Sequence, residues 1–389
     1  MHFSGRLGSH TDTNAMSVLA EELKADGLTI VNLSDSNPTR HGLSPDAVIE
    51  ALSDRSSLMY SPDPKGLVSA RLALARRFGG YAESYFLSAS TSEAYSWLFK
   101  LLCNPGDSVL VPKPGYPLFD SLAGLECIQA VPYRLAYTHP RGWSIDIDDM
   151  IRAARTSKAK AIVVINPNNP TGSYVSASEK AAIVKACSEL DLALIADEVF
   201  LPYTIEAEPA VQSFRGSQEA LTFTLDGLSK LLCLPQLKLG WMRVSGPAAL
   251  VSEASIRLEI IADTYLSAGA PVMHALPALL LKANPFVHSV RCRLIENLAT
   301  ARHIFGGDES PYRVLRCDGG WSALLEYPRV LKEEALALSL LEKEHIAVQP
   351  GYFFDMERDG YLSISLILQQ DIFAETVSRV RRHIDSLLS

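Results

Sequence analysis

Short apolar runs alternate with amphipathic segments between about residue 84 and residue 245, and this alternation constrains the fold more than any other feature. The runs cover residues 85–87, 108–111, 127–131, 161–165, 192–196, 221–225 and 239–244. The segments between them include helical patterns at 93–102 and 178–190. Continuously apolar strands separated by helices indicate a parallel sheet that is covered on both faces. We therefore predict an α/β fold with a mostly parallel central sheet flanked by helices.

Polar groups follow three of these runs. Asn169 belongs to the Asn-Pro-Asn-Asn-Pro-Thr-Gly stretch at 166–172, Asp197 follows the run at 192–196, and Lys230 comes soon after the run at 221–225. Ligands of such sheets bind beyond the carboxyl ends of the strands, so we expect an amide, a carboxylate and an amine at one edge. Taken singly, Asp197 is equally explained as a helix N-cap, and a lone lysine is usually a solvated surface charge.

An amine beside a carboxylate is what pyridoxal 5′-phosphate requires. Its aldehyde needs an amine, for which Lys230 is the candidate, with a second role as catalytic base and acid. Its pyridine nitrogen must stay protonated so that the ring can accept electrons, and a neighbouring carboxylate such as Asp197 favours that charge. The two residues therefore predict a cofactor site that holds pyridoxal phosphate as a Schiff base.

The phosphate and the ring of the cofactor need partners of their own. Ser90, Thr91 and Ser92 open a predicted helix, where free backbone N–H groups and hydroxyls suit an anion. Tyr116, in a Lys-Pro-Gly-Tyr-Pro stretch, is predicted to stack on the pyridine ring, although a tyrosine of the core would fit the same pattern.

The length of 389 residues exceeds one ordinary core, so we expect two domains. Residues 45–285 would form a large cofactor-binding domain. Residues 1–44 and 286–389 would form a small α+β domain, with the N-terminal segment lining the substrate pocket. The region from about 247 to 306 is mostly helical in pattern, with Pro271 and Pro277 as expected interruptions.

The composition of the chain limits the classes of partner that it is expected to bind. A formal net charge of −8 argues against nucleic acid, which calls for a basic surface. No run approaches twenty apolar residues, so we expect no membrane span. Residues 1–17 contain no apolar export segment, and we predict a cytoplasmic protein. The six cysteines and nine histidines lack the spacing of zinc sites, so no metal is expected.

The chain resembles a fold-type-I pyridoxal-phosphate enzyme of the class I/II aminotransferase family. The resemblance rests on three motifs in order, Asn-Pro-x-Asn-Pro-Thr-Gly, Asp-Glu-Val and Ser-Lys. It implies that Asn169 donates to the ring oxygen of the cofactor, that Asp197 pairs with the pyridine nitrogen and that Lys230 carries the Schiff base. It also implies that Tyr60 reaches the phosphate bound by a neighbouring subunit, which makes an active homodimer with shared sites. The implied reaction is a ping-pong transfer of an amino group from an amino donor to a keto acceptor.

Three departures from the family pattern concern the cofactor. Phe200 stands where the family usually has a tyrosine that donates to the ring oxygen, so we expect a higher pKa for the Schiff base. Lys238 stands where an arginine usually binds the phosphate; it keeps the charge but loses the planar fork of donors. Gly227 stands where a serine usually reaches the phosphate. Phosphate binding would therefore depend more on the turn at 90–92.

A fourth departure concerns the substrate. Ser363 stands where the family has the arginine that binds the substrate α-carboxylate as a bidentate pair. Either another group takes this role or the substrate carries no α-carboxylate. Arg40 is the first replacement candidate, together with Asn37 of the same N-terminal loop, and Arg358 is the second. A solvated surface charge explains either arginine as well.

Other functions fit parts of the pattern. A pyridoxal-phosphate lyase that eliminates a β-substituent, such as a C–S lyase, would use the same scaffold. A non-catalytic regulator that senses the cofactor would need a DNA-binding module, and only about forty residues precede the first pocket loop. A nicotinamide-dependent dehydrogenase would need a Gly-x-Gly-x-x-Gly turn after the first strand, and the sequence has none there.

Overall fold

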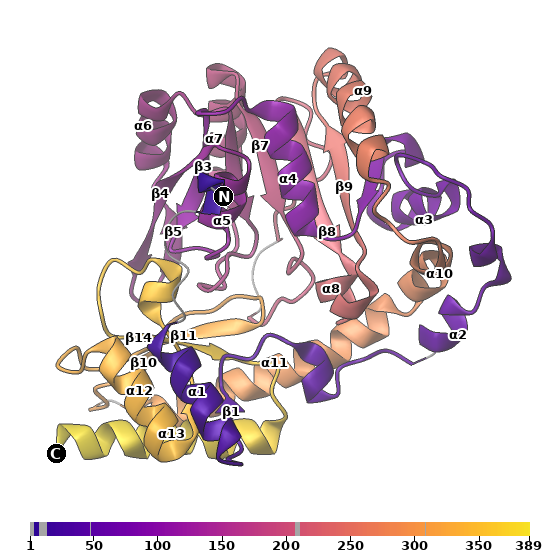
Figure 1. The fold of residues 1–389 in the computed structure, drawn as a ribbon. Helices are drawn as coiled ribbons and strands as arrows, with labels where there is room; N and C mark the ends of the chain where they lie inside the picture. The colour runs from indigo at the N-terminus through magenta and orange to yellow at the C-terminus, as the bar shows by residue number, and fades with distance from the viewer. Residues whose placement is uncertain (1–3, 8–13, 47, 207–210, 308) are drawn as a thin grey trace.

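The protein is described by a computed structural model at residues 4–7, 14–46, 48–206, 211–307 and 309–389. Its centre is a sheet with the strand order β2-β9-β8-β7-β6-β3-β4-β5 (Figure 1). Strands β3, β4, β6, β7 and β8 run parallel, whereas β9 is antiparallel to both its neighbours and β5 is antiparallel to β4. The strands are β2 (Tyr85–Ser88), β3 (Ser108–Lys113), β4 (Gln129–Thr138), β5 (Gly142–Ile145), β6 (Ala161–Ile165), β7 (Ala193–Asp197), β8 (Thr222–Gly227) and β9 (Gly240–Ser245).

Alternate residues of the central strands face two different helical layers. Val163 and Ile195 pack against the layer of α4 (Thr91–Leu102), α5 (Phe119–Leu125) and α9 (Ala248–Tyr265). Ile162 and Leu194 pack against the layer of α6 (Ile147–Ser157) and α7 (Ala177–Leu190). Both faces of these strands are therefore buried, which confirms the predicted α/β fold and explains why the strands read as unbroken apolar runs.

The C-terminal part and the first strand together build a second, smaller sheet region (Figure 1). Its four antiparallel strands have the order β10-β11-β14-β13. A separate parallel pair joins β1 to β12 and ties the N-terminal segment to this region. The elements are α1 (Ala15–Ala25), β1 (Val31–Asn32), α11 (Ala283–Phe305), β10 (Arg313–Val314), β11 (Ser322–Glu326), α12 (Glu333–Glu344), β12 (Ile346–Ala347), β13 (Gln349–Pro350), β14 (Tyr361–Ser365) and α13 (Gln370–Leu388).

The remaining helices are mostly short. They are η1 (Gly5–Leu7), η2 (Pro38–His41), α2 (Val48–Leu52), η3 (Arg55–Leu58), α3 (Val68–Phe78), η4 (Ala82–Ser84), α8 (Leu228–Leu231), η5 (Pro235–Leu237), α10 (Ala270–Leu281) and η6 (Gly351–Phe354). The prediction that Pro277 interrupts a helix is wrong, since Pro277 lies inside α10 and only Pro271 lies at a helix start. Proline has no backbone N–H, so one helical hydrogen bond is missing at Pro277. Leu276, Leu279 and Leu280 are buried in the core on either side of it, and their packing outweighs the free-energy cost of that missing bond.

Among the described residues, no helix combines the length and the apolar character needed to cross a bilayer. The sequence of residues 1–17 contains no apolar export segment. Residues 1–3 and 8–13 of this stretch lie outside the described residues.

Candidate active site

Lys230 lies at the end of β8, in the short helix α8 that follows it. Its Nζ is 4.9 Å from the centre of the Trp321 ring and 5.3 Å from that of the Phe200 ring. Burial lowers the pKa of Lys230, and the nearby charges of Cys233 and Asp197 oppose that shift. The Tyr203 hydroxyl donates to the Lys230 carbonyl oxygen at 2.7 Å and so fixes the backbone of α8. A buried amine with a depressed pKa is a better nucleophile than a solvated lysine.

Asp197 ends β7, the strand next to β8. The Tyr95 hydroxyl donates to its Oδ2 at 3.0 Å, and the Val199 amide donates to its Oδ1 at 3.2 Å. Burial raises the pKa of Asp197 to about 6, although both hydrogen bonds and the Lys230 charge act in the opposite direction. The carboxylate is therefore buried without a full counter-charge, and a cation bound beside it would be strongly favoured.

One cavity of about 140 Å³ contains both residues. It is lined by Ser36, Thr91, Ser92, Tyr95, Tyr116, Ile165, Asn169, Asp197, Val199, Phe200, Lys230, Trp321, Ser322 and Ser365. Six of these residues were predicted from the sequence as cofactor ligands: Thr91, Ser92, Tyr116, Asn169, Asp197 and Lys230. The parallel strands β6, β7 and β8 therefore deliver their polar ends to one place, as the strand pattern indicated.

The first turn of α4 forms one wall of this cavity. Ser90 is its N-cap, and its Oγ accepts the Glu93 amide at 3.1 Å. Ser90 is not among the lining residues, whereas Thr91 and Ser92 are. The free N–H groups of a first helical turn carry about half a positive charge, so this wall suits an anion.

The 166–172 stretch is held rigidly beside the cavity. The Asn166 Oδ1 accepts the Val175 amide at 3.0 Å, and the Asn166 Nδ2 donates to the Gln212 carbonyl at 2.6 Å. The Asn168 Nδ2 donates to the Pro114 carbonyl at 3.1 Å, which links this stretch to the loop that carries Tyr116. The next residue, Asn169, lines the cavity.

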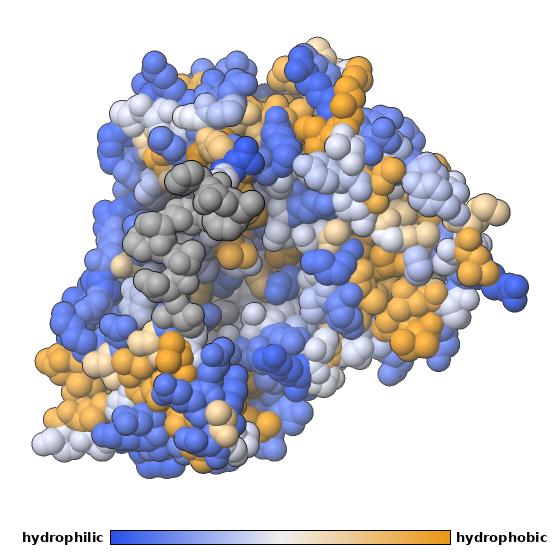
Figure 2. Space-filling model, viewed as in Figure 1, coloured by the Kyte–Doolittle hydropathy of each residue, from blue (hydrophilic) through white to orange (hydrophobic). Residues whose placement is uncertain are grey.

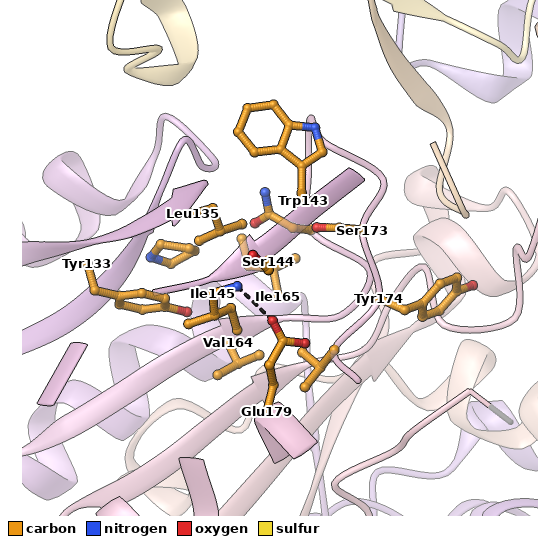
Figure 3. Close-up of a pocket in the computed structure, with 13 residues that line it drawn as sticks. Tyr133, Leu135, Trp143, Ser144, Ile145, Val164, Ile165, Ser173, Tyr174 and Glu179 are labelled. Carbon is orange, nitrogen blue, oxygen red and sulfur yellow. Dashed lines mark hydrogen bonds between the residues drawn. The ribbon is translucent and has the colours of Figure 1, made fainter. Parts of the chain in front are cut away.

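A second, smaller cavity lies on the edge side of the sheet and is shown in Figure 3. Its volume is about 10 Å³, and Tyr133, Trp143 and Glu179 are among its lining residues. The Glu179 carboxylate accepts the Ile145 amide at 2.7 Å. This space suits one water molecule at most, and neither Lys230 nor Asp197 lines it. It is not the functional cavity.

Two predicted phosphate ligands lie away from the cavity within this chain. Lys238 is exposed and in a left-handed conformation with φ 51°. Tyr60 is 78% exposed and lines a separate surface hollow with Leu266 and Ser267. Neither side chain contributes to the wall around Lys230.

The residues proposed for the substrate carboxylate are also placed outside the lining. Asn37 caps η2 through its own side chain, and Arg40 is 68% exposed and pairs with Asp35 at 3.4 Å. The Arg358 Nε donates to the Tyr361 hydroxyl at 2.8 Å. Ser363 is buried within β14 and is likewise absent from the lining.

Several lining residues were not singled out from the sequence. Tyr95 has the clearest signal, because it lies four residues after Thr91 and so occupies the same face of α4. The wall opposite α4 comes from Ser36 of the N-terminal loop, Trp321 and Ser322 at β11, and Ser365 at the end of β14. Isolated serines in three distant segments carry no periodic pattern that would bring them together.

A buried ion network lies beneath the two strand ends. Arg215 contacts the Asp226 Oδ2 at 2.8 Å and the Glu198 Oε2 at 3.4 Å. Glu198 directly follows Asp197, and Asp226 precedes Lys230 by four residues. Arg215 therefore ties together the ends of β7 and β8 that carry the two central side chains.

Comparisons with known proteins agree with this geometry. Residues 29–372 match the family described as aminotransferase class I and II. The glutamate-pyruvate aminotransferase AlaA of Haemophilus influenzae is 28% identical over 93% of this chain and 92% of its own length. The alanine aminotransferase of Mycobacterium tuberculosis is 28% identical over 93% of this chain and 87% of its own. The solved alanine aminotransferase from Pyrococcus furiosus superimposes with a TM-score of 0.88 at 23% identity, covering 99% of this chain and 100% of that one. The protein therefore belongs to the class I and II aminotransferase family and is an aminotransferase.

Proposed function

We propose that the cavity around Lys230 binds pyridoxal 5′-phosphate and that the protein transfers an amino group from an amino acid or amine to a 2-oxo acid. The observation that carries this proposal is the placement of a buried amine and a buried carboxylate in one cavity, with Asn169 and the first turn of α4 beside them. The donor set suits each part of the cofactor, which has an aldehyde, a pyridinium nitrogen, a ring oxygen and a phosphate. When bound, the cofactor supplies an electron sink for the substrate carbon that bears the amino group.

Each side chain then has a defined task. Lys230 holds the cofactor through its ε-amine and afterwards moves the proton at the substrate α-carbon as base and acid. Asp197 keeps the pyridine nitrogen protonated, which in turn stabilises its own buried charge. Thr91 and Ser92 bind the phosphate at the start of α4, and Asn169 donates to the ring oxygen. Tyr116 packs on the ring.

The overall reaction proceeds in two halves. Over the two halves the amino donor becomes a carbonyl compound and the 2-oxo acid becomes an amino acid, and the cofactor, when bound, would supply the carrier for the amino group between them. The names of the relatives, glutamate-pyruvate and alanine aminotransferases, support this two-substrate exchange.

A homodimer with shared sites is part of the proposal. Apolar surface gathers over α2 and α10 in Figure 2. The exposed apolar side chains there and in the adjoining segment include Ile49, Leu58, Met59 and Leu281, each more than 70% exposed. Such a contiguous surface is typical of a protein interface. Tyr60 adjoins this surface, so a partner subunit docked on it would receive Tyr60 near its own phosphate site, with Lys238 as a further ligand.

Two further parts of the proposal concern organisation and location. We assign residues 45–285 to a large cofactor-binding domain, and residues 1–44 and 286–389 to a small domain. The pairing of β1 with β12 supports the assignment of the N-terminal segment to the small domain. All six cysteines are free thiols, which supports a reducing compartment such as the cytoplasm.

Borohydride trapping tests the central assignment. The cofactor-loaded protein is reduced with borohydride, digested and mapped by mass spectrometry, and the label is expected on Lys230. The Lys230→Ala variant should remain colourless with the cofactor, whereas the matched Lys238→Ala variant should still be labelled at position 230. Label on another lysine would refute the proposal.

A panel of amino donors then separates transamination from β-elimination, since elimination from cysteine would release pyruvate and ammonia.

A further inference from the structure

The described residues of this chain that line the cavity around Lys230 offer no uncommitted positive charge for a substrate carboxylate. Among its fourteen lining residues, Asp197 is the only one with a carboxyl side chain and Lys230 the only one with a basic side chain. They have opposite signs, so the lining is close to neutral, and the phosphate of the proposed cofactor would add negative charge. A carboxylate, whether of an amino acid donor or of the 2-oxo acid acceptor, gains no counter-ion from these fourteen residues, so its binding carries a desolvation cost that a neutral group avoids.

The two arginines that the sequence suggested for the substrate carboxylate, Arg40 and Arg358, each have a partner outside the cavity. Arg40 pairs with Asp35, and its side chain is 68% exposed. Arg358 donates to the Tyr361 hydroxyl and pairs with Glu326 at 3.3 Å. Ser363 lies two residues before Ser365 on β14, so both serines project from the same face of the strand. A short hydroxyl therefore occupies the position from which a long guanidinium side chain could have reached the cavity.

Neutral hydrogen-bond donors form this wall instead. Trp321 lines the cavity and is only 3% exposed, yet its indole Nε1 is buried without a hydrogen-bond partner among the described residues. Ser322 follows it and pairs in register with Ser365 on β14. The Ser365 hydroxyl donates to the Asp35 carbonyl at 2.7 Å, which leaves its oxygen free to accept. Ser36 adds a further hydroxyl from the N-terminal loop. An indole N–H is a donor only, so the group it binds must be an oxygen or another acceptor.

We propose that the substrate end of the cavity binds a neutral oxygen function through Trp321 Nε1 and the hydroxyls of Ser36, Ser322 and Ser365, so that amino alcohols serve as amino donors at least as well as the matching amino acids. This inference rests on the proposed function, because it names the donor class of the same site. A hydroxyl both donates and accepts, so it matches the indole N–H and the serine hydroxyls without bringing an unpaired charge into the cavity.

Three donors with one carbon skeleton test this inference. L-alanine, L-alaninol and propan-2-amine carry a carboxylate, a hydroxymethyl group and a methyl group beside the same amine-bearing carbon. Single-turnover kcat/KM values are measured with the cofactor-loaded enzyme, from the spectral change and from the release of pyruvate, hydroxyacetone and acetone. We expect L-alaninol to equal or exceed L-alanine and to exceed propan-2-amine by about tenfold. In the same preparation, calorimetry with the unreactive pair propanoate and propanamide should show propanoate binding no more tightly.

Two variants make the test specific to the wall. Trp321→Phe keeps an aromatic ring but removes the N–H, so the ratio of L-alaninol to propan-2-amine should fall about tenfold. Ser363→Arg should shift the ratio of L-alanine to L-alaninol toward the amino acid by a hundredfold or more.

The possible failures are distinguishable. If borohydride labels Lys230 while L-alanine is preferred over L-alaninol, or if propanoate binds more tightly than propanamide, this inference is wrong and the proposed function stands. An unchanged donor ratio in Trp321→Phe would also overturn it. Label away from Lys230 would overturn the proposed function and this inference with it.

Discussion

The hydrogen bond from Tyr95 to Asp197 should determine how tightly the protein holds its cofactor. Both side chains are buried, and among the described residues the Asp197 carboxylate accepts two hydrogen bonds, from the Tyr95 hydroxyl and from the Val199 amide. Tyr95→Phe removes one of these donors and keeps the ring. The carboxylate then loses part of what stabilises its charged form, so its pKa should rise further above its ordinary value.

The magnitude follows from the charge of the acceptor. A hydrogen bond to a charged group contributes about 1.5–3 kcal/mol. Binding of a protonated pyridine nitrogen requires Asp197 in its charged form, so most of this free energy should be lost from cofactor binding. At about 1.4 kcal/mol per factor of ten, the dissociation constant should rise about 10- to 150-fold.

The assay is a titration of cofactor-free protein with pyridoxal 5′-phosphate, followed by visible absorbance at neutral pH. Tyr133→Phe is the matched control, because Tyr133 is equally buried and its hydroxyl donates to the Val163 carbonyl at 2.9 Å, outside the cavity that holds Lys230. Both variants should lose comparable stability, whereas only Tyr95→Phe should bind the cofactor more weakly. A dissociation constant within threefold of the parent protein would refute the reasoning.

Three further predictions address other contacts. Phe200→Tyr adds a hydroxyl to the ring that Lys230 contacts. One added hydrogen bond should lower the midpoint pH of the cofactor's visible absorption change by about one unit. An unchanged midpoint in a spectrophotometric titration would contradict this. In the cofactor-free protein, folded Asp197 (pKa about 6) keeps a proton that the unfolded chain releases near pH 4, so this residue's contribution to stability should decline as pH rises from about 4 to 6. Urea unfolding at pH 4.5 and 6.5 should show a smaller decline in Asp197→Asn, and equal declines would contradict this. Leu58→Asp should weaken the proposed dimer in light scattering, whereas Val330→Asp, at a comparably exposed site on the small sheet region, should leave the mass unchanged; a dimer in both variants would exclude this surface.

The central sheet was predictable because strands that are buried on both faces appear in the sequence as continuous apolar runs. The run at 161–165 coincides with β6, and those at 192–196 and 221–225 are each one or two residues out of step with β7 and β8. The antiparallel strand β9 was not distinguished from its parallel neighbours, because an apolar run does not encode direction. The strand β5 was missed since it is short and only partly buried.

The side of the cavity formed by the central sheet was predictable for a related reason. Asn169, Asp197 and Lys230 each follow a strand, and adjacent parallel strands end at the same edge, so proximity in space follows from position along each run. Their roles toward the cofactor stay predictions that trapping and titration will test.

The opposite wall could not be predicted because it depends on pairings between distant segments. Ser36 is brought to the cavity by the β1–β12 pairing and by the Ser365 hydrogen bond to the Asp35 carbonyl, across 330 residues of sequence. Arg40 was expected to point into this region, but Asp35 lies close enough to compete for its charge. This ion pair between residues five apart has no signature in the spacing of the motifs, and the role of Arg40 toward the substrate stays a prediction.

The two central charges also favour tight binding of the proposed cofactor, although lysine and glycine stand at positions 238 and 227. Burial acts against the charged forms of both Asp197 and Lys230, raising one pKa and lowering the other. A protonated pyridine nitrogen gives Asp197 a counter-ion, and covalent attachment of the aldehyde consumes the amine of Lys230. Binding therefore removes the unfavourable burial of both groups, and the free energy recovered in this way adds to the affinity for the cofactor. Cofactor binding should consequently raise the melting temperature of the parent protein more than that of Asp197→Asn, in which one of these two unfavourable burials is already absent.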